Sequence, residues 1–231
     1  MDTVHSAPMA GRAQPAREEM LNHPRLNIVD NQLARTLLSK LRDRRTDVAT
    51  FNVVAAELAR LVLFEACRQI PVKTVQGEGF DGSPIEIVRP AEAIAGVAVL
   101  RAGLIFEPAF RMLLPGCPFY QLGIKRDEET LEPIIYTDNV PDIAGWADRV
   151  LIVDPMLATG GTINAAIAVI REHHAGPLDV LSLVAAPYGV KAVTDFDPHA
   201  QITTLALDSH LNPQGYIVPG LGDAGDRYFG T

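Results

Sequence analysis

The stretch 150–162 constrains the fold of this chain more than any other part. Four apolar residues run into Asp154, and a turn then closes on two glycines and Thr162. Apolar residues recur at helical spacing over the next positions, 163–170. The pattern predicts a buried strand, a turn and a helix, with Thr162 as a suitable N-cap.

The chemistry of this turn favours a sugar phosphate as its ligand. Gly160 and Gly161 let the backbone approach a ligand and present successive N–H groups to it beside a helix N-terminus, which suits a phosphate. Asp154 would repel a phosphate, but it suits the hydroxyls of an attached sugar, or a metal ion. The alternative is a connecting turn that binds no ligand, in which the glycines only allow the backbone to turn tightly.

Composition limits the remaining possibilities. The chain has 231 residues, of which 48% are hydrophobic, enough for the core of one large domain. No apolar run approaches the roughly 18 residues of a membrane span, so we expect a soluble protein with no membrane partner. The net charge of −8 argues against a nucleic-acid partner. Cys67 and Cys117 lack metal-site spacing, which favours a reduced, cytoplasmic protein.

The N-terminal part divides into a tail and a helical region. Residues 1–22 lack apolar periodicity, and we expect a mobile tail followed by a single domain over 23–231. Leucines recur at helical spacing over 33–41, and a second helix is expected over 47–68. Leu41, Arg42 and Asp43, ahead of the second helix, are interpreted as a solvated, charged helix end.

Short apolar strands alternate with helices through the rest of the chain. An antiparallel pair is expected from 72–75 and 85–88. Further strands are expected at 96–100, 119–124, 150–153, 180–184 and 202–207, with a helix over 104–114. The alternation predicts an α/β fold with a mainly parallel sheet, whose ligands bind beyond the carboxyl ends of the strands.

Two further strand ends carry arginines. Arg101 follows the 96–100 strand and precedes small residues, and its guanidinium fork would fit a diphosphate. Lys125 and Arg126 follow the 119–124 strand and begin a charged run that could close over a leaving group. The alternatives are a surface arginine capping a strand and a solvated loop.

The last residues form a glycine-rich loop. Gly220, Gly222 and Gly225 fit the bare dinucleotide fingerprint, but the few residues after Gly225 leave no room for the crossover helix and second strand that it requires. A loop of this composition could instead hold a small planar base through backbone hydrogen bonds. The alternative is a C-terminal tail folded for packing.

These motifs together resemble a known family. Residues 154–162 are similar to the ribose 5-phosphate loop of type I phosphoribosyltransferases, and Pro155, where most of those enzymes carry a second acid, resembles the uracil phosphoribosyltransferase branch. The segments 100–104, 127–133, 151–161 and 215–231 occur in the order of that family, so the resemblance covers about 23–231.

The resemblance implies both a fold and a reaction. It implies the type I phosphoribosyltransferase fold, a mainly parallel central sheet flanked by helices, with a flexible loop or hairpin over the site and an N-terminal helical part. The implied reaction of pyrimidine salvage moves the 5-phosphoribosyl group of its 1-diphosphate (PRPP) to N1 of uracil, giving UMP and pyrophosphate. The resemblance also implies Mg²⁺ as cofactor, a homo-oligomer (dimer or tetramer) and, in part of the family, GTP as an effector.

The site residues that the resemblance implies fall into two groups. PRPP would be bound by Arg101, Arg126, Asp154, Pro155, Met156, Leu157, Ala158, Thr159, Gly160, Gly161, Thr162 and Asp223. Uracil would be bound by Ile217, Gly222, Asp223 and Ala224. Arg101 and Arg126 would stabilise the leaving diphosphate, no protein nucleophile is expected, and Mg²⁺ would be held mainly through PRPP, with no certain protein ligand.

Two departures from the family pattern keep other functions open. Lys125 stands where a tyrosine is usual, and Asn52 where an arginine is common. One alternative is a related phosphoribosyltransferase for another pyrimidine-like base, and another is a non-catalytic regulator that binds PRPP or a nucleotide.

Overall fold

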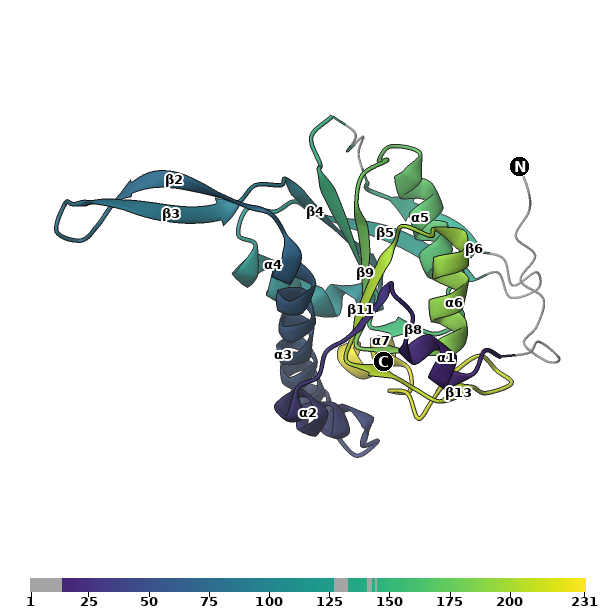
Figure 1. The fold of residues 1–231 in the computed structure, drawn as a ribbon. Coiled ribbons are helices and arrows are strands. Elements are labelled where there is room, and N and C mark those ends of the chain that lie inside the picture. Colours follow the sequence, from purple (N-terminus) through teal and green to yellow (C-terminus); the bar gives the residue numbers. More distant parts are fainter. Residues whose placement is uncertain (1–13, 127–132, 141–142, 144) are drawn as a thin grey trace.

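A seven-stranded sheet forms the centre of the computed structural model, which describes residues 14–126, 133–140, 143 and 145–231 (Figure 1). In sheet order the strands are β1 (Leu26–Ile28), β11 (Gln201–Thr204), β9 (Leu178–Leu181), β7 (Arg149–Val153), β4 (Ile94–Leu100), β5 (Phe119–Arg126) and β6 (Pro133–Asp138). All neighbours are parallel except β5 and β6, which are antiparallel. The expected mainly parallel sheet is therefore confirmed.

Helices cover both faces of this sheet, because its strands are apolar on both sides. Along β7, Leu151 packs into one core and its neighbours Val150 and Ile152 into the other, as strand alternation requires. The first core is closed by α2 (Gln32–Arg42), α3 (Val48–Ala66), η2 (Ala102–Phe106) and α4 (Glu107–Leu113), and the second by α5 (Gly161–Arg171) and α6 (Pro187–Phe196). A 3₁₀ turn, η1 (Cys67–Gln69), extends α3.

Two of the expected strands are each divided between two sheets. The 180–184 segment forms β9 and then β10 (Val184–Ala185), and the 202–207 segment forms β11 and then β12 (Ala206–Leu207). Together with β8 (Met156–Leu157), these short strands make a second, parallel sheet in the order β12-β10-β8. Between β9 and β10, the N–H groups of Leu183 and Val184 both donate to the carbonyl of Pro155 (3.0 and 3.1 Å), which interrupts the regular pairing of the strand. The small sheet therefore places the 154–162 turn beyond the central strands.

The expected antiparallel pair is present and extends away from the body of the molecule (Figure 1). It consists of β2 (Val72–Glu78) and β3 (Pro84–Pro90). The C-terminal part adds the two-stranded β13 (His210–Leu211) and β14 (Ile217–Val218), followed by α7 (Ala224–Phe229). No helix in the described part of the chain is long and apolar enough to cross a membrane.

The N-terminal segment joins the fold earlier than expected. Residues 1–13 lie outside the described residues, but Arg17–Leu21 forms the helix α1, in which Met20 is buried. The Gln14 carboxamide and the Arg17 guanidinium bond to the backbone of Leu211 and Leu207, respectively, at 2.8 Å. The expected tail boundary at residue 22 is therefore wrong for residues 14–22, because their anchoring contacts are with the far end of the chain and leave no local periodic pattern.

Candidate active site

Arg101 and Asp154 directly follow β4 and β7, whereas β5 continues to Arg126, two residues beyond the expected end at 124. Leu100 of β4 pairs with Gly123 of β5, and Ala98 of β4 pairs with Val153 of β7. Arg101, Arg126 and Asp154 are therefore brought to the carboxyl edge, where parallel sheets bind ligands. The side chain of Arg126 and the whole of 127–132 lie outside the described residues.

The turn after β7, which we call the phosphate loop (residues 154–162), surrounds a small cavity. The cavity has a volume of about 110 Å³ and opens beside the N-terminus of α5. Its lining consists of Asp154, Met156, Leu157, Ala158, Thr159, Gly160, Thr162, Ile163 and Gly215. Seven of the residues expected to bind PRPP thus share one concave surface, while Pro155 is buried behind it and Gly161 starts the helix.

The start of α5 differs from the expectation. The N-cap is Gly160, with a positive φ of 80°, and not Thr162, which lies inside the helix. Gly160 has no side chain to cap the helix, and the N–H of Gly161 donates to the hydroxyl of Thr159 at 3.5 Å. A positive φ suits glycine, so the glycine pair sets the turn and leaves helix N–H groups directed at the cavity.

Helix α6 supports the phosphate loop from behind. A Cβ on Gly189 would stand 2.5 Å from the carbonyl oxygen of Ala158 and 2.8 Å from that of Leu157. A larger side chain at this position would have to displace the loop. The sequence contained no signal for Gly189, because the contact depends on how α6 packs.

Asp154 carries the main electrostatic feature of the site. Burial raises the pKa of its carboxyl to about 7, the N–H of Met156 (3.2 Å) opposes this shift, and the nearby Asp223 carboxylate adds to it. Asp154 belongs to the phosphate loop and Asp223 to the C-terminal loop. The structure therefore brings two acids from distant parts of the chain to one site.

Arg101 lies at the start of η2, after a cis peptide bond between Leu100 and Arg101. Its guanidinium forms an ion pair with Asp226 at 2.9 Å and lies 5.5 Å from the centre of the Phe229 ring. Gly103 holds this turn close to β7, because a Cβ there would stand 2.6 Å from the carbonyl oxygen of Val153. Arg101, which is expected to bind the diphosphate, therefore lies at the same edge of the sheet as Asp154 without lining the cavity of the phosphate loop, and it has a partner on α7 that sequence reasoning missed.

The residues expected to bind uracil form one turn, which we call the base loop (residues 217–224). In the antiparallel pair β13–β14, Leu211 lies opposite Ile217. The Gln14 side chain bonds both the N–H and the C=O of Leu211 (2.8 Å each). Directly opposite residues exchange both ladder bonds or neither, so the N–H and C=O of Ile217 point away from β13. The carbonyl oxygen of Ile217 instead lies close to Gly220, where a Cβ would stand 2.2 Å from it.

Gly215 links the two loops. It lines the phosphate cavity, and a Cβ there would lie 3.6 Å from the Thr159 methyl carbon. Its φ of 85° favours glycine. Gly215 was not among the expected ligands, although the glycine density of the C-terminal stretch was a signal that could have included it.

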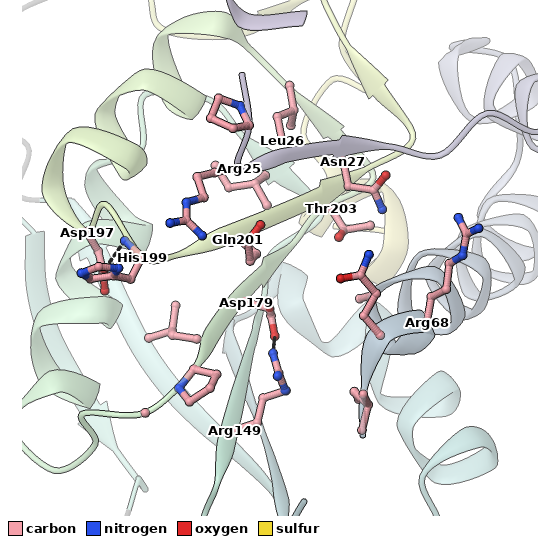
Figure 2. A pocket seen from close by; sticks show the side chains of 18 of the residues that line it. Arg25, Leu26, Asn27, Arg68, Arg149, Asp179, Asp197, His199, Gln201 and Thr203 are labelled. Carbon is pink, nitrogen blue, oxygen red and sulfur yellow. Dashed lines mark hydrogen bonds and ion pairs between the residues drawn. The ribbon is translucent and has the colours of Figure 1, made fainter. Parts of the chain in front are cut away.

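A larger cavity, of about 960 Å³, lies at the opposite, amino ends of the strands (Figure 2). Two arginines that line it are already neutralised, since Arg149 pairs with Asp179 and Glu92 (2.7 and 2.6 Å) and Arg171 pairs with Asp197 (2.6 Å). None of the expected site residues lines this cavity. We therefore place the candidate active site at the smaller cavity, which seven of the residues expected to bind PRPP line.

A parallel sheet whose central strand ends in an acid and a phosphate-type turn, with an arginine turn and a glycine-rich loop beside it, defines a type I phosphoribosyltransferase. The sequence model of the family described as Uracil phosphoribosyltransferase matches residues 28–231. The chain belongs to this family, whose members are pentosyltransferases.

Individual relatives agree with this assignment. The chain is 41% identical over 212 residues to a uracil phosphoribosyltransferase of Lacticaseibacillus paracasei, covering 92% of this chain and 97% of the relative. It is 41% identical over 211 residues to that of Deinococcus radiodurans, covering 89% and 98%. A solved structure of an Aquifex aeolicus protein is similar, with a TM-score of 0.82 and 33% identity over 88% of this chain and 97% of the other.

Proposed function

We propose that this protein transfers the 5-phosphoribosyl group of PRPP to N1 of uracil. The bond between C1 of the ribose and the diphosphate breaks, the bond from C1 to N1 forms, and UMP, pyrophosphate and a proton are released. The observation that carries the proposal is the shared cavity, in which the phosphate loop and Gly215 of the C-terminal segment face one another. A phosphorylated ribose held there would have its reacting carbon near the base loop.

The phosphate loop would bind the ribose 5-phosphate through backbone N–H groups at the start of α5, together with the hydroxyls of Thr159 and Thr162. Asp154 would accept hydrogen bonds from the ribose hydroxyls, as carboxylates commonly do. Such binding needs the ionised carboxylate, whose pKa is raised to about 7 in the free protein. PRPP binding is therefore expected to strengthen as the pH rises through 7.

The departing diphosphate needs positive charge. Arg101 would supply it after leaving Asp226, and Arg126 would supply it from the end of β5. The ribosyl group would develop cationic character, so a dry site and an aligned base would do most of the catalysis, without a protein nucleophile.

Mg²⁺ is the cofactor that the proposal includes. Among the described residues, no group of three or more His, Cys, Asp or Glu side chains is arranged to hold a metal ion. Asp154 and Asp223 offer oxygen ligands of the kind that Mg²⁺ prefers, alongside the phosphate oxygens of PRPP. Bound with PRPP, the ion would neutralise charge on the diphosphate.

Uracil would be read by the backbone of Ile217, Gly222 and Ala224. Backbone donors and acceptors at fixed positions reject a base with the wrong pattern, because a mismatch leaves buried groups unpaired. Oligomerisation and a response to GTP, which the family resemblance implies, remain parts of the proposal that binding and sedimentation measurements would address.

A panel of bases, assayed with PRPP and Mg²⁺ for pyrophosphate release, tests the function. Turnover with uracil supports the proposal. Turnover only with another pyrimidine-like base would instead support a related phosphoribosyltransferase for that base. PRPP binding without turnover would support a non-catalytic regulator. Arg126→Ala should raise the KM for PRPP and lower kcat, and unchanged kinetics would remove Arg126 from the site.

A further inference from the structure

We propose that Arg42 and Asp208 are positioning residues that set the base loop for reading uracil. Arg42 is the last residue of α2, and Asp208 follows β12, far from it in the chain. Arg42 was expected to be part of a solvated helix end, and this expectation is wrong. Its guanidinium is largely buried against Asp208, with side-chain exposures of 21% and 4%.

The side chains of Arg42 and Asp208 bind the backbone carbonyl and the backbone N–H, respectively, of Gly220 in the base loop. The carboxylate of Asp208 accepts two hydrogen bonds from Arg42 (2.6 and 2.8 Å) and one from the N–H of Gly220 (2.9 Å). Arg42 also donates to the carbonyl of Gly220 (3.0 Å). Both backbone polar groups of Gly220 are therefore bound by a charged pair that is itself bidentate.

Gly220 is the point at which the base loop folds back on itself. Its φ is 60°, and a Cβ there would lie 2.2 Å from the carbonyl oxygen of Ile217. The position of Gly220 thus sets where the Ile217 backbone stands relative to Gly222, and these are two of the proposed uracil contacts. A small displacement of this turn would change the spacing of the groups that read the base.

A second arginine fastens the next residue to the same end of α2. Arg227 donates to the carbonyl of Leu221 (2.8 Å) and to the carbonyls of Asp43 (2.8 Å) and Leu41. Its guanidinium lies 4.4 Å from the centre of the Phe51 ring. This side of the base loop is therefore bound to the N-terminal helices, and the proposal assigns its opposite side to the base.

Loss of either partner of the buried Arg42–Asp208 ion pair is expected to affect the base loop as well as the stability of the fold. Removing one partner leaves a buried charge and releases one of the two Gly220 backbone groups, so the loop is held less firmly and the fold loses some stability. The proposal rests on the proposed function. It predicts that variants of the pair weaken the use of uracil and its discrimination from cytosine, whose donor and acceptor pattern differs, while PRPP binding at the phosphate loop is retained.

The test compares Arg42→Met and Asp208→Asn with Arg45→Met. Arg45 is a matched control, because it lies just beyond α2 and pairs with Asp43 on the surface without contacting the base loop. Steady-state kinetics would be measured with each base and PRPP, after circular dichroism and thermal unfolding have confirmed a folded protein at the assay temperature.

The expected result for Arg42→Met and Asp208→Asn is a KM for uracil raised about ten- to a hundredfold. The KM for PRPP should stay within about twofold, and the preference for uracil over cytosine should fall by about tenfold or more. Arg45→Met should match the unmodified protein. An equal loss of PRPP and uracil binding, or unchanged kinetics, would overturn the proposal.

If Arg42→Met and Asp208→Asn fail to fold, the more conservative variant Arg42→Lys tests the proposal. Lysine keeps the charge but cannot bond Asp208 in a bidentate way and also reach Gly220, so the KM for uracil should rise with retained stability. A lysine variant that is folded and has unchanged uracil kinetics would overturn the proposal. Failure of the unmodified protein to use uracil at all would instead refute the proposed function.

Discussion

Replacing Asp154 by asparagine should make the ligand-free protein more stable at high pH while weakening PRPP binding. In the folded protein the pKa of this carboxyl is raised from 3.8 to about 7, chiefly by burial. Above pH 3.8 the unfolded chain gives up the proton and the folded protein keeps it. Stability is therefore lost as the pH rises from about 4 to 7, and the loss is complete above 7.

The magnitude follows from the size of that shift. Each pKa unit corresponds to about 1.4 kcal/mol, and the side chain keeps some contact with solvent, so the expected loss at pH 8 is about 2 to 4 kcal/mol. Asparagine has a similar shape and cannot ionise, so Asp154→Asn should be free of this loss. The difference in unfolding free energy between the variant and the unmodified protein should grow by that amount between pH 4 and pH 8.

Urea denaturation of the ligand-free proteins at several pH values measures this difference. Asp195→Asn is a suitable control, because Asp195 is an exposed carboxyl paired with Lys191 on the surface, where ion pairs contribute little to stability. With PRPP at 100 times its Kd the unmodified protein should gain about 2.7 kcal/mol of stability and the variant much less, so the advantage of the variant at pH 8 should shrink by about that amount. A difference for Asp154→Asn that does not depend on pH would refute the reasoning.

Three further outcomes are expected. Gly189→Ala should raise the KM for PRPP about ten- to a hundredfold by displacing the phosphate loop, whereas Gly145→Ala, whose Cβ would meet nothing within 4 Å, should not; equal kinetics for the two would show that α6 does not position the loop. Asp226→Asn should lower the KM for PRPP about two- to fivefold, the value of an exposed ion pair, because Arg101 no longer has to leave its partner; a raised KM would mean that the Asp226 carboxylate itself serves the site. Lys125→Tyr should leave PRPP use unchanged or improve it, and a collapse of kcat would reveal a separate role for the lysine.

Asn52, which stands where an arginine is common in the family, affects the hydrogen bonding inside the fold. Its side-chain oxygen is buried in α3 and has no hydrogen-bond partner among the described residues. An unpaired buried acceptor costs stability.

The sequence by itself determined the elements and the edge at which the chemistry lies. Apolar runs of strand length, helical spacing and paired glycines are local patterns, so they predicted the β7 strand, the phosphate loop and α5. They also placed Arg101 and Asp154 at the carboxyl ends of two strands, whose adjacency in the sheet only the structure shows. These predictions depend on backbone conformation within a few residues, which side-chain spacing reports directly.

Only the tertiary structure decided which distant residues meet and how deeply each is buried. Arg42 and Asp208 are 166 positions apart, and Gln14 reaches Leu211 over 197 positions. The raised pKa of Asp154 likewise results from burial and from Asp223, neither of which a local pattern encodes. Contacts and desolvation arise when elements pack, so charged residues that resemble a solvated helix end in the sequence can become the buried support of a binding loop.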